Sequence, residues 1–273
     1  WCIGGFFPVI LRQEFGDIAF PYFVVFNVLG AAAFGFVWTE GRRAAFLSRM
    51  RTPAQLFSAV VVVFQIWFII WLSALIGMVW PLALFGAASA LTLMFRQREG
   101  AMALVLLSVT VAIFLYVVAN APAVTIPFQA IEPFTHQILP LAFGFALAPY
   151  FDLTFHDAFR NSPNPRLTFG LAFLGIFAAF LAGMYAAAPT LAALLFDTPE
   201  LTHALAAMVA LLAAQTGFTT AVHTVRISGA LRHHGFLIPG ALTVVTVPLA
   251  IATVWPDALA VLGVLIYKNF IFV

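Results

Sequence analysis

One apolar segment of this sequence carries five hydrogen-bonding side chains within nine residues: Gln215, Thr216, Thr219, Thr220 and His223. On an α-helix, Thr216, Thr220 and His223 share one face through i, i+4 and i+7 spacing, and Gln215 and Thr219 lie beside it. Two interpretations of this polar stripe stay open. It lines a path for a solute or a proton, or it makes hydrogen bonds between helices and to the preceding turn.

Two further amides lie near the middle of other apolar segments, Asn27 and Gln65. Polar groups inside a membrane are costly, so they are the first residues to consider for function. Together with the polar stripe, they form our hypothesis for a substrate or ion path. We identify no catalytic residue.

A metal site is the weaker possibility. His136 and His203 are expected at similar depth, Glu132 precedes the first by four residues, and Glu200 precedes the second by three. Two Glu/His pairs on neighbouring helices can bind a divalent ion, as in carboxylate-bridged bundles. However, only one pair has the Glu-x-x-His spacing, and Pro133 interrupts the other. We therefore expect no metal here.

Other chemistry has less support. His203 and His223 are 20 residues apart, which places them roughly 30 Å apart along a helix and argues against stacked haems. Motifs of the GxSxG, HExxH and P-loop types are absent from the sequence. The single cysteine, Cys2, cannot form an internal disulfide. We expect no cofactor and regard an enzyme as less probable than a transporter.

The charge pattern predicts how the elements that carry these residues are arranged. Ten of the twelve basic residues fall in four segments, which alternate with segments that contain no Lys or Arg. Positive charge near span ends is retained in the cytoplasm. We therefore predict cytoplasmic loops near Arg49, Arg98, Arg160 and Arg232. Outward-facing segments are expected near Ser73, between Ala121 and Phe134, and at Asp197 and Asp257, with Arg12 the lone basic residue outside and Lys268 in a ninth span.

About 20 apolar residues cross the hydrocarbon core as a helix. The stretch from Phe57 to Phe95 has 39 residues without a formal charge, too long for one span, so a tight turn is expected near Ser73 to Gly77. Eight spans are predicted: Ile18 to Trp38, Phe57 to Ser73, Gly77 to Phe95, Ala101 to Asn120, Thr135 to Leu153, Leu167 to Ala188, Leu201 to Val222 and Leu237 to Val254. A ninth begins near Leu259.

Local patterns add expectations about packing. Small residues four apart, such as Ala31 and Gly35 or Gly144 and Ala148, allow close approach of helices, as do Gly175, Ala179 and Gly183. Pro140 and Pro149 are expected to break the fifth span. Beyond that span, Asp152 and His156 are four residues apart and are predicted to form a surface ion pair if the helix continues.

Composition supports a membrane protein. Hydrophobic residues make up 64% of the chain and charged residues 8%, far below the roughly one quarter usual in soluble domains. The net charge of +2 resides in the loops and suits contact with anionic lipid headgroups rather than nucleic acid. The expected partners are therefore the lipid bilayer and a small solute or coupling ion, and the oligomeric state cannot be predicted.

The predicted fold is all-α, a polytopic transmembrane helical bundle with about eight full spans and partial spans at both ends. The chain opens at Trp1 and stops within an apolar run, so we interpret residues 1–273 as one integral membrane domain of a longer chain. The leading functional hypothesis is a secondary transporter or permease in an inner or plasma membrane. A non-catalytic membrane subunit or scaffold is second, and a membrane-embedded enzyme or metal/redox protein is third.

Overall fold

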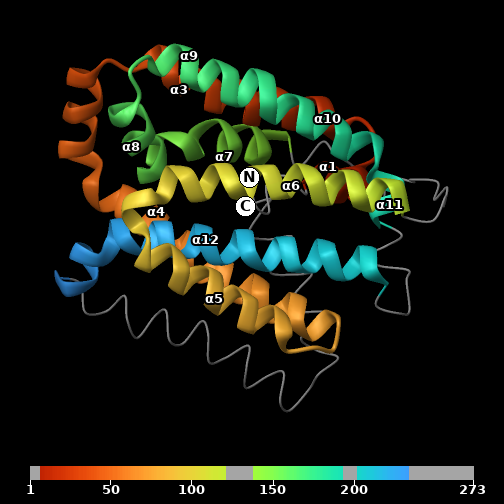
Figure 1. Cartoon of the computed structure of the whole chain (residues 1–273). Coiled ribbons are helices and arrows are strands. Elements are labelled where there is room, and N and C mark those ends of the chain that lie inside the picture. Colours follow the sequence, from red (N-terminus) through yellow and green to blue (C-terminus); the bar gives the residue numbers. More distant parts are fainter. Residues whose placement is uncertain (1–6, 121–137, 193–201, 234–273) are drawn as a thin grey trace. The chain divides into compact units, whose positions relative to one another are not determined.

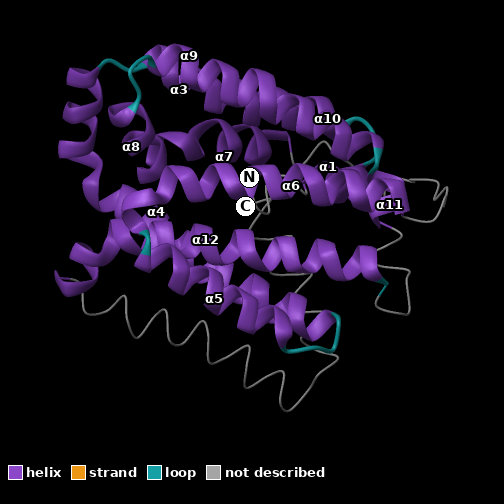
Figure 2. Cartoon of the chain, in the orientation of Figure 1, coloured by secondary structure: helices purple, strands orange, loops and turns teal. Residues whose placement is uncertain are grey.

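A computed structural model describes residues 7–120, 138–192 and 202–233 (Figure 1). All regular structure in these ranges is helical, joined by short turns (Figure 2). Backbone N–H and C=O groups have no water to bond in hydrocarbon, so an apolar chain satisfies them within helices. The predicted all-α class is therefore confirmed for the described residues.

The chain divides into two compact units. Unit 1 comprises Trp1–Ala54, Asn120–Glu200 and Ile271–Val273, and unit 2 comprises Gln55–Ala119 and Leu201–Phe270. Each unit is thus assembled from segments that are distant in sequence. The single membrane domain stays a prediction about the chain as a whole.

Unit 1 is built around two continuous helices that each contain a π-helical segment. The first runs through α2 (Ala19–Phe23), the π-helical segment η2 (Val24–Leu29) and α3 (Gly30–Val37). The second runs through α9 (Pro165–Phe169), the π-helical segment η5 (Gly170–Phe177) and α10 (Ala178–Ala186). The other helices of this unit are α1 (Phe7–Phe15), the start of α4, α7 (Ile138–Phe151), α8 (Leu153–Asn161) and α11 (Ala188–Ala192).

Unit 2 contains the longest regular helices. These are the apolar part of α4 (Glu40–Leu75), α5 (Trp80–Met94), α6 (Glu99–Asn120) and α12 (His203–His233), with a short 3-10 turn over Arg96–Arg98. Thr202 caps the start of α12, where its hydroxyl accepts a hydrogen bond from the Leu205 N–H at 3.2 Å. Helix α5 packs along α12.

Among the described residues, five helices are long and apolar enough to cross a membrane: Ala19–Val37, Glu40–Leu75, Arg96–Asn120, Pro165–Ala186 and His203–Ile227. Two shorter apolar helices, Trp80–Met94 and Ala142–Phe151, lie where the third and fifth spans were predicted. The predicted span from Leu237 and the ninth from Leu259 fall outside the described residues. The structure therefore supports an integral membrane protein but not a count of eight spans.

The fold-back within the long uncharged stretch is present. Helix α4 continues to Leu75, and the turn follows at residues 76–79, where Gly77 adopts a φ of 65°. Glycine tolerates this left-handed conformation because it has no Cβ. At its other end, α4 begins at Glu40, well before the predicted Phe57, and departs from helical geometry at Met50.

Helix α6 exposes most of its apolar surface among the described residues. Leu104 and Val105 are each 64% exposed and Leu115 is 60% exposed, whereas Thr110 and Val117 are buried. Thr110 and Val117 are seven residues apart and so lie on one side of the helix. The exposed side has the composition expected of a surface in contact with lipid chains.

Candidate functional site

Buried polar side chains concentrate in unit 2. Among the described residues, nine of the eleven buried polar or charged side chains belong to this unit. They are Ser58, Gln65, Ser73, Thr92, Thr110, Gln215, Thr216, Thr220 and His223. None of these nine described residues is an acid, a lysine or an arginine.

The predicted polar stripe lies on one uninterrupted stretch of α12. Gln215, Thr216, Thr220 and His223 are all less than 10% exposed, and Thr219 is half-buried. The Thr220 hydroxyl has no hydrogen-bond partner among the described residues. Such a buried hydroxyl requires a partner, from water, from a solute or from a part of the chain that is not described.

Gln215 connects α12 to α6. Its side-chain Nε2 donates to the Thr110 hydroxyl at 2.7 Å, and that hydroxyl donates to the Leu106 carbonyl at 2.7 Å. Thr110 thus acts as donor and acceptor, so both groups are satisfied. This part of the stripe holds helices together, as the structural interpretation predicted for it.

Gly217 brings α12 into close contact with α5. A Cβ atom at this position would lie 2.5 Å from the Phe85 carbonyl oxygen and 2.9 Å from the Ala88 Cβ. The Ser89 hydroxyl donates to the Gly217 carbonyl at 3.0 Å. Small residues allow this approach, which provides the packing and hydrogen bonding that associate helices in membranes.

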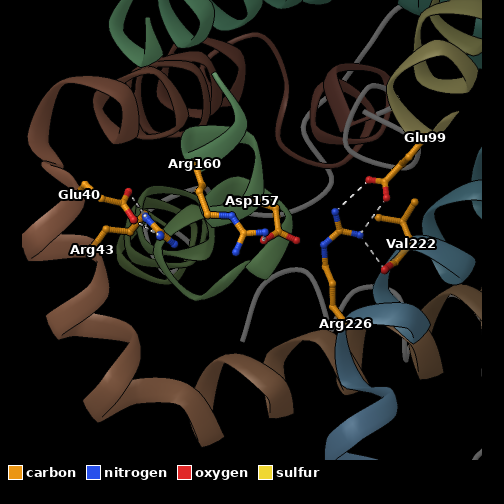
Figure 3. Close-up of polar contacts among 7 residues, drawn as sticks. All are labelled: Glu40, Arg43, Glu99, Asp157, Arg160, Val222 and Arg226. Carbon is orange, nitrogen blue, oxygen red and sulfur yellow. Dashed lines mark hydrogen bonds and ion pairs between the residues drawn. The ribbon is translucent and has the colours of Figure 1, made fainter. Parts of the chain in front are cut away.

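An ion pair joins the ends of α6 and α12. Arg226 Nη2 lies 2.9 Å from Glu99 Oε1, and Arg226 Nη1 also donates to the Val222 carbonyl at 2.8 Å (Figure 3). The Arg226 side chain is 11% exposed. Glu99 is in the first turn of α6, where the helix dipole favours an acidic group.

Asn27 lies in unit 1, whereas the other six candidate path residues lie in unit 2. Asn27 is half-buried within η2, which contacts η5 and α7. Just after η2, a Cβ atom at Gly30 would lie 2.8 Å from the Ala146 Cα of α7. A π-helical segment disturbs the regular backbone hydrogen bonding and occurs often at functional sites.

His156 is the buried residue that sequence reasoning placed wrongly. Asp152 has extended geometry and caps α8, its carboxylate accepting from the Thr154 N–H at 2.8 Å, so the helix does not continue. His156 is 1% exposed, and its Nε2 lies 2.8 Å from the Tyr150 carbonyl oxygen. The predicted surface ion pair is therefore wrong, because the chain turns and carries the histidine inward.

Aromatic rings surround His156. Phe46 stacks on the imidazole with ring centroids 5.8 Å apart, and the Phe34 ring meets it edge-on at 5.0 Å. The indole Nε1 of Trp38 and the Nδ1 of His156 are both buried without a hydrogen-bond partner in the described structure. Loss of hydration lowers the pKa of His156, and the nearby Arg43 adds to this effect. Because Nε2 faces a carbonyl, it carries the proton of the neutral ring.

Charged residues gather at the two ends of unit 1. Near His156, Arg43 Nε donates to Glu40 Oε2 at 3.0 Å, and Arg160 lies 3.6 Å from Asp157 (Figure 3). At the other end, Arg12 binds Asp17 at 2.7 Å and donates to the Tyr185 carbonyl at 3.0 Å. The lone basic residue of the predicted outer side is therefore neutralised by an acid.

Within each unit, basic segments share an end. In unit 1, packing around Phe34, Trp38 and Phe169 brings the segments of Arg43 and Arg160 together. In unit 2, the ion pair brings the Arg98 segment to the part of α12 that leads to Arg232. This pairing agrees with the charge pattern, although which end is cytoplasmic stays a prediction.

The weak metal candidates are only partly described. Glu132, His136 and Glu200 lie outside the described residues, and His203 is exposed at the start of α12. Over the ranges that are described, no group of three or more His, Cys, Asp or Glu side chains is placed to hold a metal ion.

The small-residue patterns predicted some of the close contacts between helices but not others. Gly35 is tightly packed, since an added Cβ would lie 2.7 Å from the Pro165 carbonyl oxygen. Gly144 and Gly175 have no neighbour within 4 Å of an added Cβ. Gly217 was not singled out, although it follows Thr216 within the polar stripe. Ser58 could have been found from its spacing, since it precedes Gln65 by seven residues.

Comparison with known proteins gives no further identification: no family model, no curated protein and no solved structure matches this chain.

Proposed function

We propose that this chain is a secondary transporter or permease for a small solute, with its path through the interior of unit 2. The observation that carries the proposal is the set of buried, uncharged polar side chains on α4, α5 and α12. Buried polar groups cost free energy in a membrane unless they are paired or hydrated, and they often mark solute paths. The buried Thr220 hydroxyl, which has no hydrogen-bond partner among the described residues, supports this proposal.

Two further features are compatible with transport. The chain forms two compact units built from interleaved segments, and transporters commonly move one helical bundle against another. Unit 1 also contains two helices with a π-helical segment, η2 with Asn27 and η5. Such segments within α-helices are frequent at functional sites.

A scaffold is the second candidate, and a specific observation favours it. Gln215 is satisfied by Thr110, and Gly217 packs tightly against α5, so part of the polar stripe acts as structural contacts. A scaffold requires every buried polar group of unit 2 to be paired and inaccessible to water. The two functions therefore differ in whether water reaches Thr216 and Thr220.

The deciding experiment measures that access and flux together. Cys2 is replaced by Ser, and single cysteines are placed at Thr216 and Thr220 in the full chain reconstituted into liposomes. Transport predicts modification by a small water-soluble thiol reagent. It also predicts uptake of at least one solute from a panel of amino acids, sugars and nucleobases under imposed ion gradients. Uptake should fall in His223→Ala and Gln215→Ala.

A matched control is a cysteine at Thr110, whose hydroxyl is occupied by Gln215 and Leu106. If neither the cysteine at 216 nor the one at 220 reacts, and solute uptake does not exceed that of protein-free liposomes, the scaffold becomes the preferred function. Reaction at 110 equal to that at 216 and 220 would indicate loosened packing rather than a path.

A further inference from the structure

The first turns of α4 form a helix that lies across the spans of unit 1. Helix α3 ends at Val37, Trp38 has extended geometry, and α4 begins at Glu40. Figure 1 shows this first part of α4, in orange, running across the direction of α3 and α9. The helix then departs from regular geometry at Met50 (φ −109°, ψ 20°) before the apolar part of α4. This is the placement of a helix in a membrane interface.

One face of this crossing segment, residues 40–51, is anchored to unit 1. Phe46 packs on Trp38 at 5.2 Å, on Phe151 at 5.9 Å and on His156 at 5.8 Å between ring centroids. Arg43 lies on the same side, is 6% exposed and is committed to Glu40. The crossing segment is therefore held in place by packing and not by its outward charges.

The exposed positions of the crossing segment, including those on either side of Phe46, carry cations without acidic partners. Arg42, Arg49 and Arg51 are exposed, and none of them has a carboxylate within ion-pair distance in the part of the chain that is described. Arg42 and Arg49 are seven residues apart and so share one side of the crossing segment. A repulsive cluster of this kind is stabilised when anions bind to it.

A further unpaired cation is present at the same end of unit 1. Arg166 is exposed in the first turn of α9, where the helix dipole disfavours positive charge. Helices α3 and α9 pack together, with an added Cβ at Gly35 lying 2.7 Å from the Pro165 carbonyl. This end of unit 1 therefore presents four exposed arginines that lack a described acidic partner.

We propose that the crossing segment is a binding surface for anionic phospholipid headgroups, with Arg42 and Arg49 as its principal contacts. Arginine forms paired hydrogen bonds to phosphate oxygens, and basic clusters next to a span attract anionic lipids. The aromatic residues on the inner face hold the crossing segment at headgroup depth, while its arginines contact the phosphates.

The test measures lipid preference beside the crossing segment. Cys2 is replaced by Ser, and Ser48, which is exposed on this segment, is replaced by Cys and labelled with bimane. The full chain is placed in phosphatidylcholine vesicles. One vesicle preparation contains a small amount of spin-labelled phosphatidylglycerol, and the other contains the same amount of spin-labelled phosphatidylcholine. In both lipids the nitroxide is near the glycerol backbone. Phosphatidylglycerol should quench the bimane severalfold more effectively, and this preference should shrink at high salt.

Two double variants each remove two positive charges, one from the crossing segment and one from unit 2. Arg42→Gln with Arg49→Gln should bring the severalfold preference close to equality, since each arginine is expected to contribute up to about fivefold. Arg96→Gln with Arg98→Gln, at exposed positions of unit 2, should leave it unchanged. Equal quenching by both lipids in the unmodified chain overturns the proposal, as does an equal loss in both double variants. The readout does not involve transport, so it stands apart from the proposed function.

Discussion

At the scale of single residues, Gly217 is the position where a side chain is least tolerated among the described glycines of unit 2. An added Cβ would meet the Phe85 carbonyl at 2.5 Å and the Ser89 amide nitrogen at 3.2 Å. Because both are backbone atoms, no side-chain rotation relieves the clash, and α5 and α12 would have to separate. The absence of a side chain at this position therefore determines how closely these helices pack.

We predict that Gly217→Ala lowers the free energy of unfolding by about 1–3 kcal/mol, the usual cost of overpacking. The measurement is thermal or denaturant unfolding in detergent. Gly86→Ala on α5 is the control, since a Cβ there meets nothing within 4 Å, and alanine has the higher helix propensity. Equal stability of Gly217→Ala and the unmodified chain would contradict the packing described here.

His156 predicts a pH dependence of stability. Its pKa is lowered in the folded protein, chiefly by loss of hydration, from an ordinary value near 6.5. Below pH 6.5 the unfolded chain therefore binds more protons than the folded one. Stability is full above pH 6.5 and falls as the pH decreases through and below that value. The hydrogen bond to the Tyr150 carbonyl opposes this lowering of the pKa, Arg43 adds to it, and Asp152 and Asp157 oppose it.

The measurement compares melting temperatures between pH 7.5 and 5 in the unmodified chain and in His156→Phe. The loss on acidification should be smaller in His156→Phe, which keeps an aromatic ring in the cluster and removes the titrating group. His203→Gln, at an exposed position, should keep the slope of the unmodified chain. A slope unchanged by His156→Phe would mean that protonation of this histidine does not destabilise the fold.

At the scale of elements, α6 depends on polar contacts with α12. Its exposed side consists of apolar residues, whereas Thr110 contacts Gln215 and Glu99 contacts Arg226. Polar groups in contact with lipid are costly, so these contacts also orient α6, keeping its polar side inward. A small number of side chains therefore determines how α6 is oriented in unit 2.

We predict that Glu99→Gln or Arg226→Gln lowers the free energy of unfolding by about 1–3 kcal/mol, the range for hydrogen bonds to charged groups. The double variant should lose less than the sum of the two, because each single change leaves its partner partly buried and unpaired. Arg98→Gln, which is exposed, is the control. Strict additivity of the two changes, measured by unfolding in detergent, would show that the pair is not coupled.

The sequence predicted elements better than the contacts between them. Runs such as Pro165–Ala186 are helical because an apolar chain in lipid has few other ways to satisfy its backbone, and composition alone reveals that. By contrast, Gly175 and Gly217 look alike in sequence, yet only Gly217 is tightly packed. The break at Asp152 was missed although it has a local signal, because aspartate is a preferred N-cap residue and its carboxylate accepts from the Thr154 N–H. The π-helical segments have no sequence signature that we could use.

At the scale of the whole molecule, charge predicts orientation, and each unit brings two basic segments to one end. The neutralised Arg12 removes the main exception to this pattern, because its charge is balanced by Asp17. The orientation rule counts basic residues near span ends, so the ends with Arg49, Arg98, Arg160 and Arg232 are predicted to be cytoplasmic.

We predict that an impermeant thiol reagent applied outside cells labels a cysteine at Met78 and not one at Ser162, with Cys2 replaced by Ser. Met78 is exposed in the turn after α4, and Ser162 follows α8 in a basic connection. Both should react once the membrane is permeabilised, which controls for reactivity. Labelling of 162 alone in intact cells would reverse the orientation.

The two contacts between α6 and α12 have equal spacing. Glu99 and Thr110 are eleven residues apart on α6, and Gln215 and Arg226 are eleven apart on α12. Eleven residues make just over three whole turns, so each helix presents its two contact residues along one edge, about 16 Å apart. Two contacts on a common line act as a hinge. They prevent α6 from rolling and from sliding along α12, but they permit α6 to rotate about the line that joins the two contacts. Spin labels should then show the distance from α6 to α5 varying while the distance from α6 to α12 stays constant.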